Sequence, residues 1–493
     1  MLISKLTQDL PATNIQMPDE ELSITSVVFD SRKVVPGSLF VAIKGSQVDG
    51  HDFLENAVES GAVALVAEHF PDGFNASNNL CLIVVPNGAE ALGMLATNWY
   101  DHPSKKLRLV GVTGTNGKTT VATLLHDAFT HLGYDAGLLS TVEIRIGHKK
   151  QAATHTTPDA MAINQALAEM VDQGVTHAFM EVSSHATQQR RIAGLKFDGG
   201  VFTNMSHDHL DYHGTFRAYI EAKKMFFDTL PASAFALVNI DDKRGAVMVQ
   251  NTAARVYRYS LRSMADYRAR LLDDNPMGLH LEIDGQEVFT RLLGRFNAYN
   301  LLAVYGVARL LEENQMDSLT ALSQLQAPAG RMQYVFDPKG ERTAVVDYAH
   351  TPDALKKVLE TLLQSLPQTS QLICVVGAGG DRDRTKRPEM ARIGARLASQ
   401  LILTSDNPRT ENPESILDEM MTGLDTPDLL ARTARITDRK TAIESALALA
   451  NPGDLVLVAG KGHETYQEIN GERLPFDDRE VIRDFFDNHT KRT

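Results

Sequence analysis

The chain has 493 residues and a formal net charge of −13 at pH 7, with 43% apolar and 23% charged residues. This composition is ordinary for a soluble globular protein, and the length predicts about three domains. A strongly acidic chain argues against nucleic acid as the main partner, because binding a phosphate backbone requires a basic surface. We therefore expect an anionic ligand to be bound locally, by helix N-termini and a few arginines.

The N-terminal segment and the cysteines indicate the compartment. Residues 1–11 are too polar for a signal peptide, and no apolar run approaches the length of a membrane span. The two cysteines, Cys81 and Cys374, each lie within an apolar run, which is typical of buried thiols in a reducing compartment. We expect a cytoplasmic protein without a membrane span, and we expect it to be a monomer.

Residues 1–88 have the pattern of a small α/β domain. Apolar runs such as 27–29 and 39–43 predict short strands. Polar loops follow these two runs at 30–32 and 45–47. Ligands often bind at strand ends in α/β domains, although ordinary surface turns are the alternative for both loops.

The segment 107–133 has the order of elements that a phosphate-binding loop requires. An apolar run at 107–112 predicts a buried strand, the sequence TGTNGKTT at 113–120 a glycine-rich turn, and the apolar periodicity from Val121 a helix. Glycines allow a tight turn whose N–H groups face phosphate oxygens, with the positive end of the helix dipole behind them. An ordinary turn is the alternative, but the flanking strand and helix favour a nucleotide site.

Two side chains of this loop are expected to contact the nucleotide. Lys118 would reach the terminal phosphates, and the Thr119 hydroxyl would bind Mg²⁺. The pattern G-x-x-x-x-G-K-[ST] is incomplete, because Val112 stands where its first glycine is usual. Glu181 follows an apolar run at 178–180, which places a carboxylate where a nucleotide-bound Mg²⁺ needs one.

A run rich in histidine and aspartate, residues 207–213, follows a further predicted strand at 199–204. Because the carboxyl ends of parallel strands meet at one edge of a sheet, we expect this run and Glu181 to converge on the phosphates bound by Lys118. The same run allows a zinc site, although a His-x-His pair beside carboxylates is not diagnostic. Capping of the following helix is the simpler interpretation.

Residues 331–493 follow a segment at 327–331 that has the composition of a hinge. Beyond it, apolar runs alternate regularly with helical patterns, which predicts a doubly wound domain. The glycines at 377–380 lack the spacing of a dinucleotide fingerprint. The predicted strands lie at 344–346, 372–376, 401–404 and 455–458.

Seven segments, taken in order, resemble the motifs of the Mur ligases of bacterial cell-wall synthesis, and the resemblance spans nearly the whole chain. It implies a three-domain α/β fold: a small N-terminal α/β UDP-binding domain at 1–88, a central P-loop ATPase-like domain at 89–330 and a C-terminal doubly wound, Rossmann-like domain at 331–493. The segments are 113–120, 181–185, 208–213, 219–223, 294–300, 347–353 and 406–409.

The resemblance implies residues that bind ATP and two magnesium ions. Thr119 and Glu181 match the ligands of one Mg²⁺, and His209 matches a histidine that helps to bind the second. Lys223 matches a lysine that the family carbamylates with CO₂, which converts a cation into a carboxylate-like ligand. The positions that match ATP-binding residues are Gly114, Thr115, Asn116, Gly117, Lys118, Thr119, Thr120, Asn297, Asn300, Arg331 and Asp347.

A UDP-linked muramoyl dipeptide is the implied acyl substrate, and it would run from the N-terminal domain into the central domain. His155 departs from the pattern, since close relatives usually carry asparagine there. The positions that match its binding residues are Phe29, Ser31, Ser46, Gln47, Val48, His155, Thr156, Thr157, Ser183, Gln189 and Arg191.

The implied amino-acid site lies in the last domain. Arg409 argues for meso-diaminopimelate rather than lysine, because a guanidinium group can bind the additional carboxylate through two hydrogen bonds. Without the resemblance, an arginine in a surface turn would be the better interpretation. The matching positions are Arg382, Asp406, Asn407, Pro408, Arg409, Gly460 and Glu464.

The implied reaction is ATP-dependent formation of an amide bond through an acyl phosphate, which should require closure of the C-terminal domain. Residues expected to take part in catalysis are Lys118, Lys223, His209, Asp347 and His350, and the general base stays open between Asp347 and His350. The alternatives are a lysine-adding ligase of the same family, a folate polyglutamylating ligase, a nucleotide-dependent switch and, least favoured, a zinc hydrolase built on 207–213.

Overall fold

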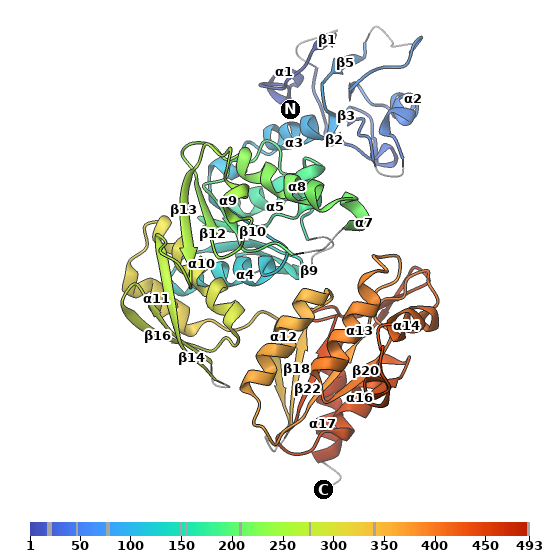
Figure 1. Ribbon diagram of the computed structural model, residues 1–493. Helices are drawn as coiled ribbons and strands as arrows, with labels where there is room; N and C mark the ends of the chain where they lie inside the picture. The colour runs from blue at the N-terminus through green and yellow to red at the C-terminus, as the bar shows by residue number, and fades with distance from the viewer. Residues whose placement is uncertain are drawn as a thin grey trace.

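The computed structural model describes residues 1–16, 22–45, 48–74, 79–147, 149–152, 156–206, 210–275, 278–338 and 342–490. Three α/β domains follow one another along the chain, with the central domain between the N-terminal and C-terminal ones (Figure 1). The predicted fold class is thereby confirmed. Among these residues, no helix combines the length and the apolar character that a membrane span needs.

The N-terminal domain is built on a sheet with the strand order β1-β5-β4-β3-β2, in which only the β1–β5 pair is antiparallel among the described pairings. The runs predicted as strands at 27–29 and 39–43 form β2 and β3. Helix α3 packs against this sheet and also contacts α5 of the central domain, so it joins the two domains. The elements are α1 (Ile3–Leu6), β1 (Asn14–Gln16), β2 (Ser26–Val28), β3 (Ser38–Val41), α2 (Leu54–Glu59), β4 (Ala64–Ala67), β5 (Cys81–Val84) and α3 (Gly88–Trp99).

The central domain is built on a long mixed sheet with the order β16-β15-β14-β13-β12-β11-β6-β10-β7-β8-β9. Its middle is parallel, and β6 lies between β10 and β11. The loop after β6 therefore lies beside the ends of both neighbouring strands. The strands are β6 (Arg108–Thr113), β7 (Ala136–Leu139), β8 (Glu143–Ile146), β9 (Lys149–Ala152), β10 (His177–Glu181), β11 (Gly199–Phe202), β12 (Phe235–Asn239), β13 (Arg255–Ser260), β14 (Tyr267–Asn275), β15 (Gly278–Ile283) and β16 (Gln286–Thr290).

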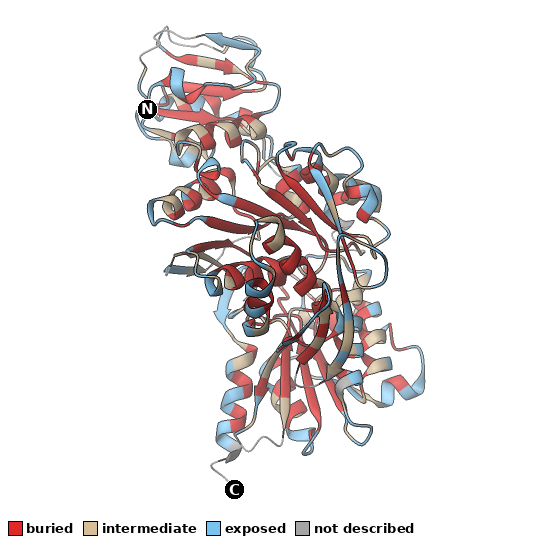
Figure 2. Cartoon of the chain, turned by 90° about the vertical axis from the view of Figure 1, so that its left-hand side faces the viewer, coloured by how far each residue is buried: buried red, intermediate tan, exposed pale blue. Residues whose placement is uncertain are grey.

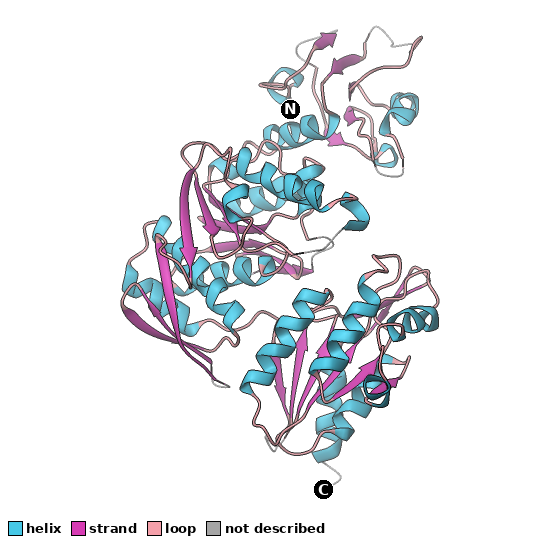
Figure 3. Cartoon of the chain, viewed as in Figure 1, coloured by secondary structure: helices cyan, strands magenta, loops and turns pink. Residues whose placement is uncertain are grey.

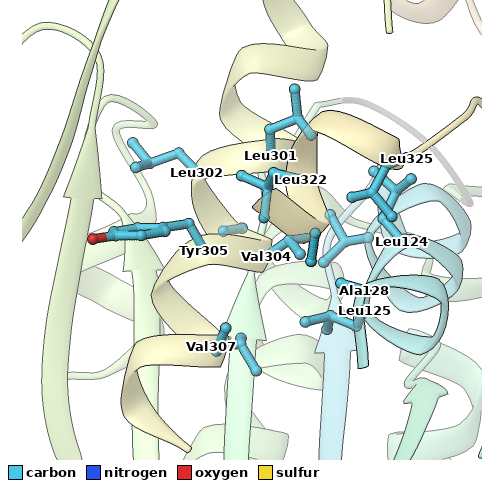
Figure 4. Close-up of a cluster of buried hydrophobic side chains, with 14 of the residues drawn as sticks. Leu124, Leu125, Ala128, Leu301, Leu302, Val304, Tyr305, Val307, Leu322 and Leu325 are labelled. Carbon is cyan, nitrogen blue, oxygen red and sulfur yellow. The ribbon is translucent and has the colours of Figure 1, made fainter. Parts of the chain in front are cut away.

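Helices cover both faces of this sheet. Side chains alternate along β6, so Val110 and Val112 join the core formed with α4, α10 and α11, whereas Leu109 joins the core on the opposite face. Figure 4 shows Leu124 and Leu125 of α4 packed near side chains of α10 and α11. This packing fixes α4 and the loop that precedes it. The helices are α4 (Lys118–His131), α5 (Ala160–Asp172), α6 (Ser184–Gln188), α7 (Leu210–His213), α8 (Phe216–Asp228), α9 (Gly245–Met248), α10 (Arg295–Leu310) and α11 (Gln315–Gln324).

The C-terminal domain has a sheet of order β17-β18-β22-β19-β20-β21 with helices on its faces (Figure 3), as the alternating pattern predicts. Its inner strands are buried because both faces are covered (Figure 2). Strands β23 and β24 form a separate hairpin. The elements are β17 (Gln333–Phe336), β18 (Thr343–Asp347), α12 (Pro352–Ser365), β19 (Leu372–Val376), α13 (Lys386–Leu397), β20 (Gln400–Leu403), α14 (Pro413–Met421), α15 (Pro427–Ala431), β21 (Thr433–Arg435), α16 (Arg439–Leu449), β22 (Leu455–Ala459), β23 (Tyr466–Ile469), β24 (Glu472–Pro475) and α17 (Asp478–Thr490).

Candidate functional site

The glycine-rich loop joins β6 to α4, as predicted from the sequence. Gly114 has φ +149° and Gly117, which precedes the first turn of α4, has φ +86°. A Cβ atom at Gly114 would lie 1.9 Å from Oγ1 of Thr203, so only glycine fits there. Lys118 folds back over the loop and donates to the carbonyl oxygens of Gly114 at 3.0 Å and Thr115 at 2.9 Å.

The hydroxyl of Thr119 connects three distant segments. It donates to Oε2 of Glu181 at 3.0 Å, and Nη2 of Arg331 donates to it at 3.0 Å. The other oxygen of Glu181 accepts from the backbone N–H of Thr141 at 2.6 Å. Glu181 is buried at the end of β10. A hydroxyl and a carboxylate oxygen side by side at the start of α4 are the donor type that Mg²⁺ prefers.

Asn204, which the sequence analysis did not single out, anchors the loop. Its side-chain oxygen accepts from the backbone N–H of Asn116 at 3.1 Å, and its Nδ2 donates to the carbonyl of Asn116 at 3.0 Å. Asn116 in turn donates through Nδ2 to Asp353 of α12 at 3.1 Å. The phosphate loop is thus bonded directly to the C-terminal domain. Asn204 ends the segment predicted as the strand beside the loop, which was the available signal for it.

Lys223 lies on α8 and is buried against the loop rather than solvated. Its side chain is 1% exposed, and its Nζ donates to the carbonyl of Gly114 at 2.8 Å. The same Nζ lies 4.8 Å from the ring centroid of Tyr219, one turn earlier on the helix. The carbonyl of Gly114 therefore accepts from both Lys118 and Lys223, so two cationic side chains meet at one atom of the loop.

A cavity of about 550 Å³ lies between the central and C-terminal domains over this loop. Besides loop residues, it is lined by the first turn of α10 and by side chains of α12 such as Lys357 and Val358. Its volume suits a nucleotide. The residues predicted to bind ATP that line it are Thr115, Asn116, Gly117, Lys118, Thr119, Thr120, Asn297, Asn300, Arg331 and Asp347.

Asp347 and His350 lie at the C-terminal end of β18, beside this cavity. Burial raises the pKa of Asp347 above its usual value, although the charge of Arg331 opposes the shift. Nδ1 of His350 is 2.8 Å from the carbonyl oxygen of Tyr348. Because a carbonyl only accepts hydrogen bonds, Nδ1 carries the proton, and Nε2 is the basic nitrogen of the neutral ring.

The residues predicted to bind the UDP-linked substrate fall into two groups. Thr157, Ser183, Gln189 and Arg191 lie together: Nη1 of Arg191 donates to the carbonyl of Thr157 at 2.6 Å, and the hydroxyls of Thr157 and Ser183 are 3.3 Å apart. The second group belongs to the N-terminal domain and consists of Phe29, Ser31 and Val48; the side chains of Phe29 and Val48 are exposed. Thr156, next to the first group, lines the nucleotide cavity. Ser46, Gln47 and His155 lie outside the described residues, as does His209, which is predicted to bind Mg²⁺.

A second cavity, of about 280 Å³, enters the C-terminal domain. Its lining combines cations with carboxylates, and the residues predicted for the amino acid that line it are Arg382, Asp406, Asn407, Arg409, Gly460 and Glu464. Pro408 instead packs its carbonyl against Gly380. His185, Asp383 and Lys386 also line this cavity, and no sequence pattern had indicated a role for them.

The two cavities meet. Thr156, Tyr348 and His350 line both of them. A phosphorylated group formed over the loop and an amine bound in the second cavity can therefore approach each other at these three residues. The geometry is that of an enzyme that activates one substrate with a nucleotide and transfers it to another.

Comparison with known proteins agrees with this geometry. The chain matches, in order, the sequence profiles of the Mur ligase family catalytic domain at residues 23–100, the Mur ligase middle domain at 112–308 and the Mur ligase glutamate ligase domain at 330–462. It is 53% identical over 467 residues to the UDP-N-acetylmuramoyl-L-alanyl-D-glutamate--2,6-diaminopimelate ligase of Cytophaga hutchinsonii, covering 95% of each chain. It is 52% identical over 470 residues to the ligase of that name from Parabacteroides distasonis, covering 95% of this chain and 96% of the other.

Solved structures give the same result. A structure of a UDP-N-acetylmuramoyl-L-alanyl-D-glutamate--2,6-diaminopimelate ligase superposes with a TM-score of 0.68 at 35% identity and covers 99% of both chains. A folylpolyglutamate synthase from Thermotoga maritima has a TM-score of 0.58 at 14% identity over 75% of this chain and 90% of that one, and so shares the fold. The protein is an ATP-dependent ligase. It belongs to the Mur ligase family.

Replacing Gly114 with alanine tests the phosphate loop. The added methyl group would collide with the Thr203 hydroxyl, and we expect the Kd for MgADP to rise about tenfold or more because the loop can no longer close on the phosphates. Isothermal titration calorimetry measures the Kd. Gly133→Ala is the matched control, since Gly133 also has a positive φ but nothing lies within 4 Å of an added Cβ. Equal affinities in two folded variants would contradict the assignment.

Proposed function

We propose that this ligase joins meso-2,6-diaminopimelate to the D-glutamate of UDP-N-acetylmuramoyl-L-alanyl-D-glutamate (UDP-MurNAc-L-Ala-D-Glu), with ATP converted to ADP and phosphate, in the synthesis of peptidoglycan precursors. The observation that carries the proposal is the junction of the two cavities, one over the phosphate loop and the other lined by cations and carboxylates. The names of the relatives that match nearly the whole chain support the choice of substrates. We expect the reaction to take place in the cytoplasm, where ATP and UDP-linked precursors are available.

The lining of the second cavity supports a zwitterionic amino acid with an additional carboxylate. Arg382 and Arg409 offer guanidinium groups, and Asp406 and Glu464 offer carboxylates. Arg409 is oriented by the carbonyl of Gly380, which accepts from its Nη1 at 2.6 Å. Diaminopimelate carries a second carboxylate where lysine has none, and a fixed guanidinium group is suited to bind it.

In the first chemical step, the γ-carboxylate of D-glutamate attacks the γ-phosphorus of ATP. The bond from that phosphorus to the β–γ bridging oxygen breaks, ADP leaves, and an acyl phosphate forms. Lys118 moves from the loop carbonyls to the phosphate oxygens and neutralises charge that develops during the transfer. Arg331 adds a second positive charge beside Thr119. Thr157, Ser183, Gln189 and Arg191 hold the acyl substrate near the loop.

In the second step, the amine of diaminopimelate attacks the acyl carbon. A C–N bond forms, the bond from carbon to the phosphate oxygen breaks, and inorganic phosphate leaves. The attacking ammonium must first lose a proton, and His350 at the junction of the cavities is the base that we assign to this transfer, since its Nδ1–H is held by the Tyr348 carbonyl and Nε2 is basic. Asp347 holds the backbone of Met332 instead, at 2.7 Å.

Thr119 and Glu181 fit one Mg²⁺ ion at the start of α4, and we propose a second ion beside Lys223. Thr119 and Glu181 would hold one ion, and His209 with a carbamylated Lys223 would help to hold the other. When bound, Mg²⁺ neutralises charge on the transferring phosphoryl group. An ammonium at Lys223 would repel such an ion, whereas a carbamate, formed by CO₂ on its neutral amine, supplies an anionic oxygen. The buried position of Lys223 against the loop supports this modification.

Two alternatives stay testable. A lysine-adding ligase of the same family would share the fold and both steps, and would differ at the end of the cavity that Arg409 lines. A phosphate-loop NTPase acting as a switch would hydrolyse ATP without an acceptor. The presence of a second, charged cavity beside the nucleotide cavity favours a ligase over a switch.

Phosphate release from ATP tests the function directly. With UDP-MurNAc-L-Ala-D-Glu present, we expect release with meso-diaminopimelate and little with L-lysine or without an acceptor, because the amine must discharge the acyl phosphate. The formation of the UDP-linked tripeptide, followed by chromatography, is measured in parallel. Release with lysine alone would establish the lysine-adding alternative, and equal release without an acceptor would establish the NTPase.

Lys223→Ala tests the modified lysine. We expect loss of most of the activity, on the order of a hundredfold, because a metal ligand is lost at the loop. Addition of a short carboxylic acid should restore part of the activity, since it can supply the anionic oxygen in the space left by the side chain. Full activity of the variant without added acid would contradict a role of Lys223 in metal binding. Lys224→Ala, at the adjacent and partly exposed position that pairs with Asp228, is the control.

Arg409→Lys tests the choice of amino acid. We expect the KM for meso-diaminopimelate to rise about tenfold or more, because an ammonium group cannot replace two parallel hydrogen bonds from a guanidinium fork. The KM for ATP should stay within about twofold, since Arg409 lines only the second of the two cavities. Steady-state kinetics with each substrate varied in turn measures both constants, and an unchanged KM for diaminopimelate would contradict the assignment.

A further inference from the structure

A buried charged cluster lies behind the amino-acid cavity. It consists of Asp406, Glu464, Lys461, Arg439 and Asp478, whose side chains come from the ends of β20 and β22 and the first turns of α16 and α17. Lys461, Arg439 and Asp478 are at most 1% exposed. Asp406 and Glu464 also line the cavity itself. The cluster thus connects the cavity to the interior of the domain.

Arg439 and Asp478 neutralise each other. Nε and Nη2 of Arg439 donate to the two carboxylate oxygens of Asp478 at 2.8 and 2.7 Å. Nη2 also donates to the carbonyl of Ala459 at 3.1 Å. A two-point ion pair of this kind leaves no net charge. The charge of Arg439 nevertheless acts on Asp406, whose pKa it lowers.

Lys461 holds the two polar side chains beside it. Its Nζ donates to Oδ1 of Asn407 at 2.9 Å and to Oε2 of Glu464 at 3.0 Å. The amide of Asn407 donates to the same Oε2 at 2.8 Å. Glu464 is therefore fixed by two donors. Because Lys461 is fully buried, its charge acts in a low dielectric on both neighbouring carboxylates.

The cluster has one carboxylate more than it has cations. Asp406, Glu464 and Asp478 stand against Lys461 and Arg439, so the cluster itself carries one net negative charge. Among the described residues, the guanidinium groups of Arg382 and Arg409 line the same cavity but bond to neither Asp406 nor Glu464. Burial tends to raise the pKa of Asp406, but the charges of Lys461 and Arg439 outweigh it and lower the pKa. Burial and the nearby charge of Asp406 raise the pKa of Glu464. A cationic ligand group would complete the balance.

The group that fits is the ammonium of diaminopimelate that does not react. An ammonium held by two carboxylates keeps its proton and so has no lone pair for attack on an acyl carbon. The reacting amine must be elsewhere, at the junction of the cavities near His350. The two ends of the ligand are therefore distinguished by charge.

We propose that Lys461 is a positioning residue of the amino-acid site, which fixes Asn407 and Glu464 and keeps the carboxylates ready to receive the non-reacting ammonium of the acceptor. This inference rests on the proposed function and deepens it. Lys461 itself is not among the described residues that line the cavity. Its effect on the ligand passes through Glu464 and Asn407.

The proposal predicts which groups of the site distinguish diaminopimelate from each of two related amino acids. The ammonium end accepts both diaminopimelate and lysine and rejects 2-aminopimelate, which keeps the far carboxylate but lacks the far amine. The guanidinium groups bind the far carboxylate, so they accept diaminopimelate and 2-aminopimelate and reject lysine. Loss of Lys461 should therefore reduce the preference for diaminopimelate over 2-aminopimelate and leave the preference over lysine in place.

It also predicts a pH effect of defined sign. Protonation of Glu464 removes the partner of the ammonium, so kcat/KM for diaminopimelate falls on the acid side as this carboxyl gains a proton. Removing the positive charge of Lys461 raises the pKa of Glu464, so the acid limb of the pH profile of kcat/KM moves to higher pH. The charged and titratable groups that interact with Glu464 or its partner Asp406 are Lys461, Arg439, Tyr348, Tyr466 and His350. Asp478 acts on Arg439.

The experiment compares the wild type with Lys461→Met and Lys461→Arg, and with Lys440→Met as control. Lys440 is an exposed lysine of α16 that pairs only loosely with Glu444. For Lys461→Met we expect the KM for diaminopimelate to rise about tenfold, the acid limb to move up by about one pH unit, and the KM for ATP to stay within about twofold. Lys461→Arg should keep the limb near its wild-type position, because it keeps the charge. Tripeptide formation with diaminopimelate, 2-aminopimelate and lysine gives the selectivity.

The outcomes separate this inference from the proposed function. Absence of diaminopimelate-dependent product in the wild type would overturn the function and the inference together. The inference alone would be overturned if the wild type is active but folded Lys461→Met shows the wild-type pH profile of kcat/KM and the wild-type selectivity. If Lys461→Met does not fold, diaminopimelate binding to the wild type is measured by calorimetry in buffers of different ionisation enthalpy. Proton release on binding that grows from pH 8 to pH 6 would support binding of the ammonium by Glu464, because a protonated Glu464 must lose its proton to bind it. Absence of proton release would overturn the inference.

Discussion

The hydroxyl of Thr119 is the point at which the nucleotide site is assembled. It has one proton, which it gives to Glu181, and two lone pairs, one of which accepts from Arg331. The remaining lone pair can bind a cation. Since Thr119 is at the start of α4, Glu181 at the end of β10 and Arg331 after the linker between domains, this one atom requires all three segments in place. The position of α4, set by its packing against α10 and α11, is therefore a precondition of the site.

The linker that carries Arg331 also touches the amino-acid site. A Cβ atom at Gly330 would lie 2.1 Å from the backbone nitrogen of His463, and one at Gly462 would lie 2.6 Å from the carbonyl of Gly330. The guanidinium of Arg331 lies 4.5 Å from the ring centroid of Tyr348, which lines both cavities. The backbone of the linker that carries Arg331 is therefore in direct contact with the loop that carries Glu464.

The sequence predicts those parts of the protein that are determined locally. Hydrophobic periodicity and glycine placement predict the strand and helix on either side of the phosphate loop and the alternating elements of the C-terminal domain, because each of these patterns lies within one short segment. The roles of Asn204, Asp353 and Lys461 were not predicted, because each depends on a partner distant in the sequence. That partner is Asn116 for Asn204 and Asp353, and Asn407 for Lys461. Lys461, between two glycines, has the pattern of a solvated turn, and only the fold shows that it is buried beside Glu464.

The local placement of charged side chains explains how an acidic protein can bind anionic substrates. Cationic side chains lie close together at the loop: Lys118 and Lys223 both donate to the Gly114 carbonyl, and Arg331 donates to the Thr119 hydroxyl. The amino-acid cavity instead mixes charges, and its lining sets Arg382, Lys386 and Arg409 against Asp383, Asp406 and Glu464. A phosphorylated acyl group is drawn toward the cations of the loop, and the ammonium groups of a zwitterionic acceptor are drawn toward Asp406 and Glu464. Because both cavities open onto Thr156, Tyr348 and His350, an acyl group bound over the loop and an amine bound in the second cavity meet at the same three residues.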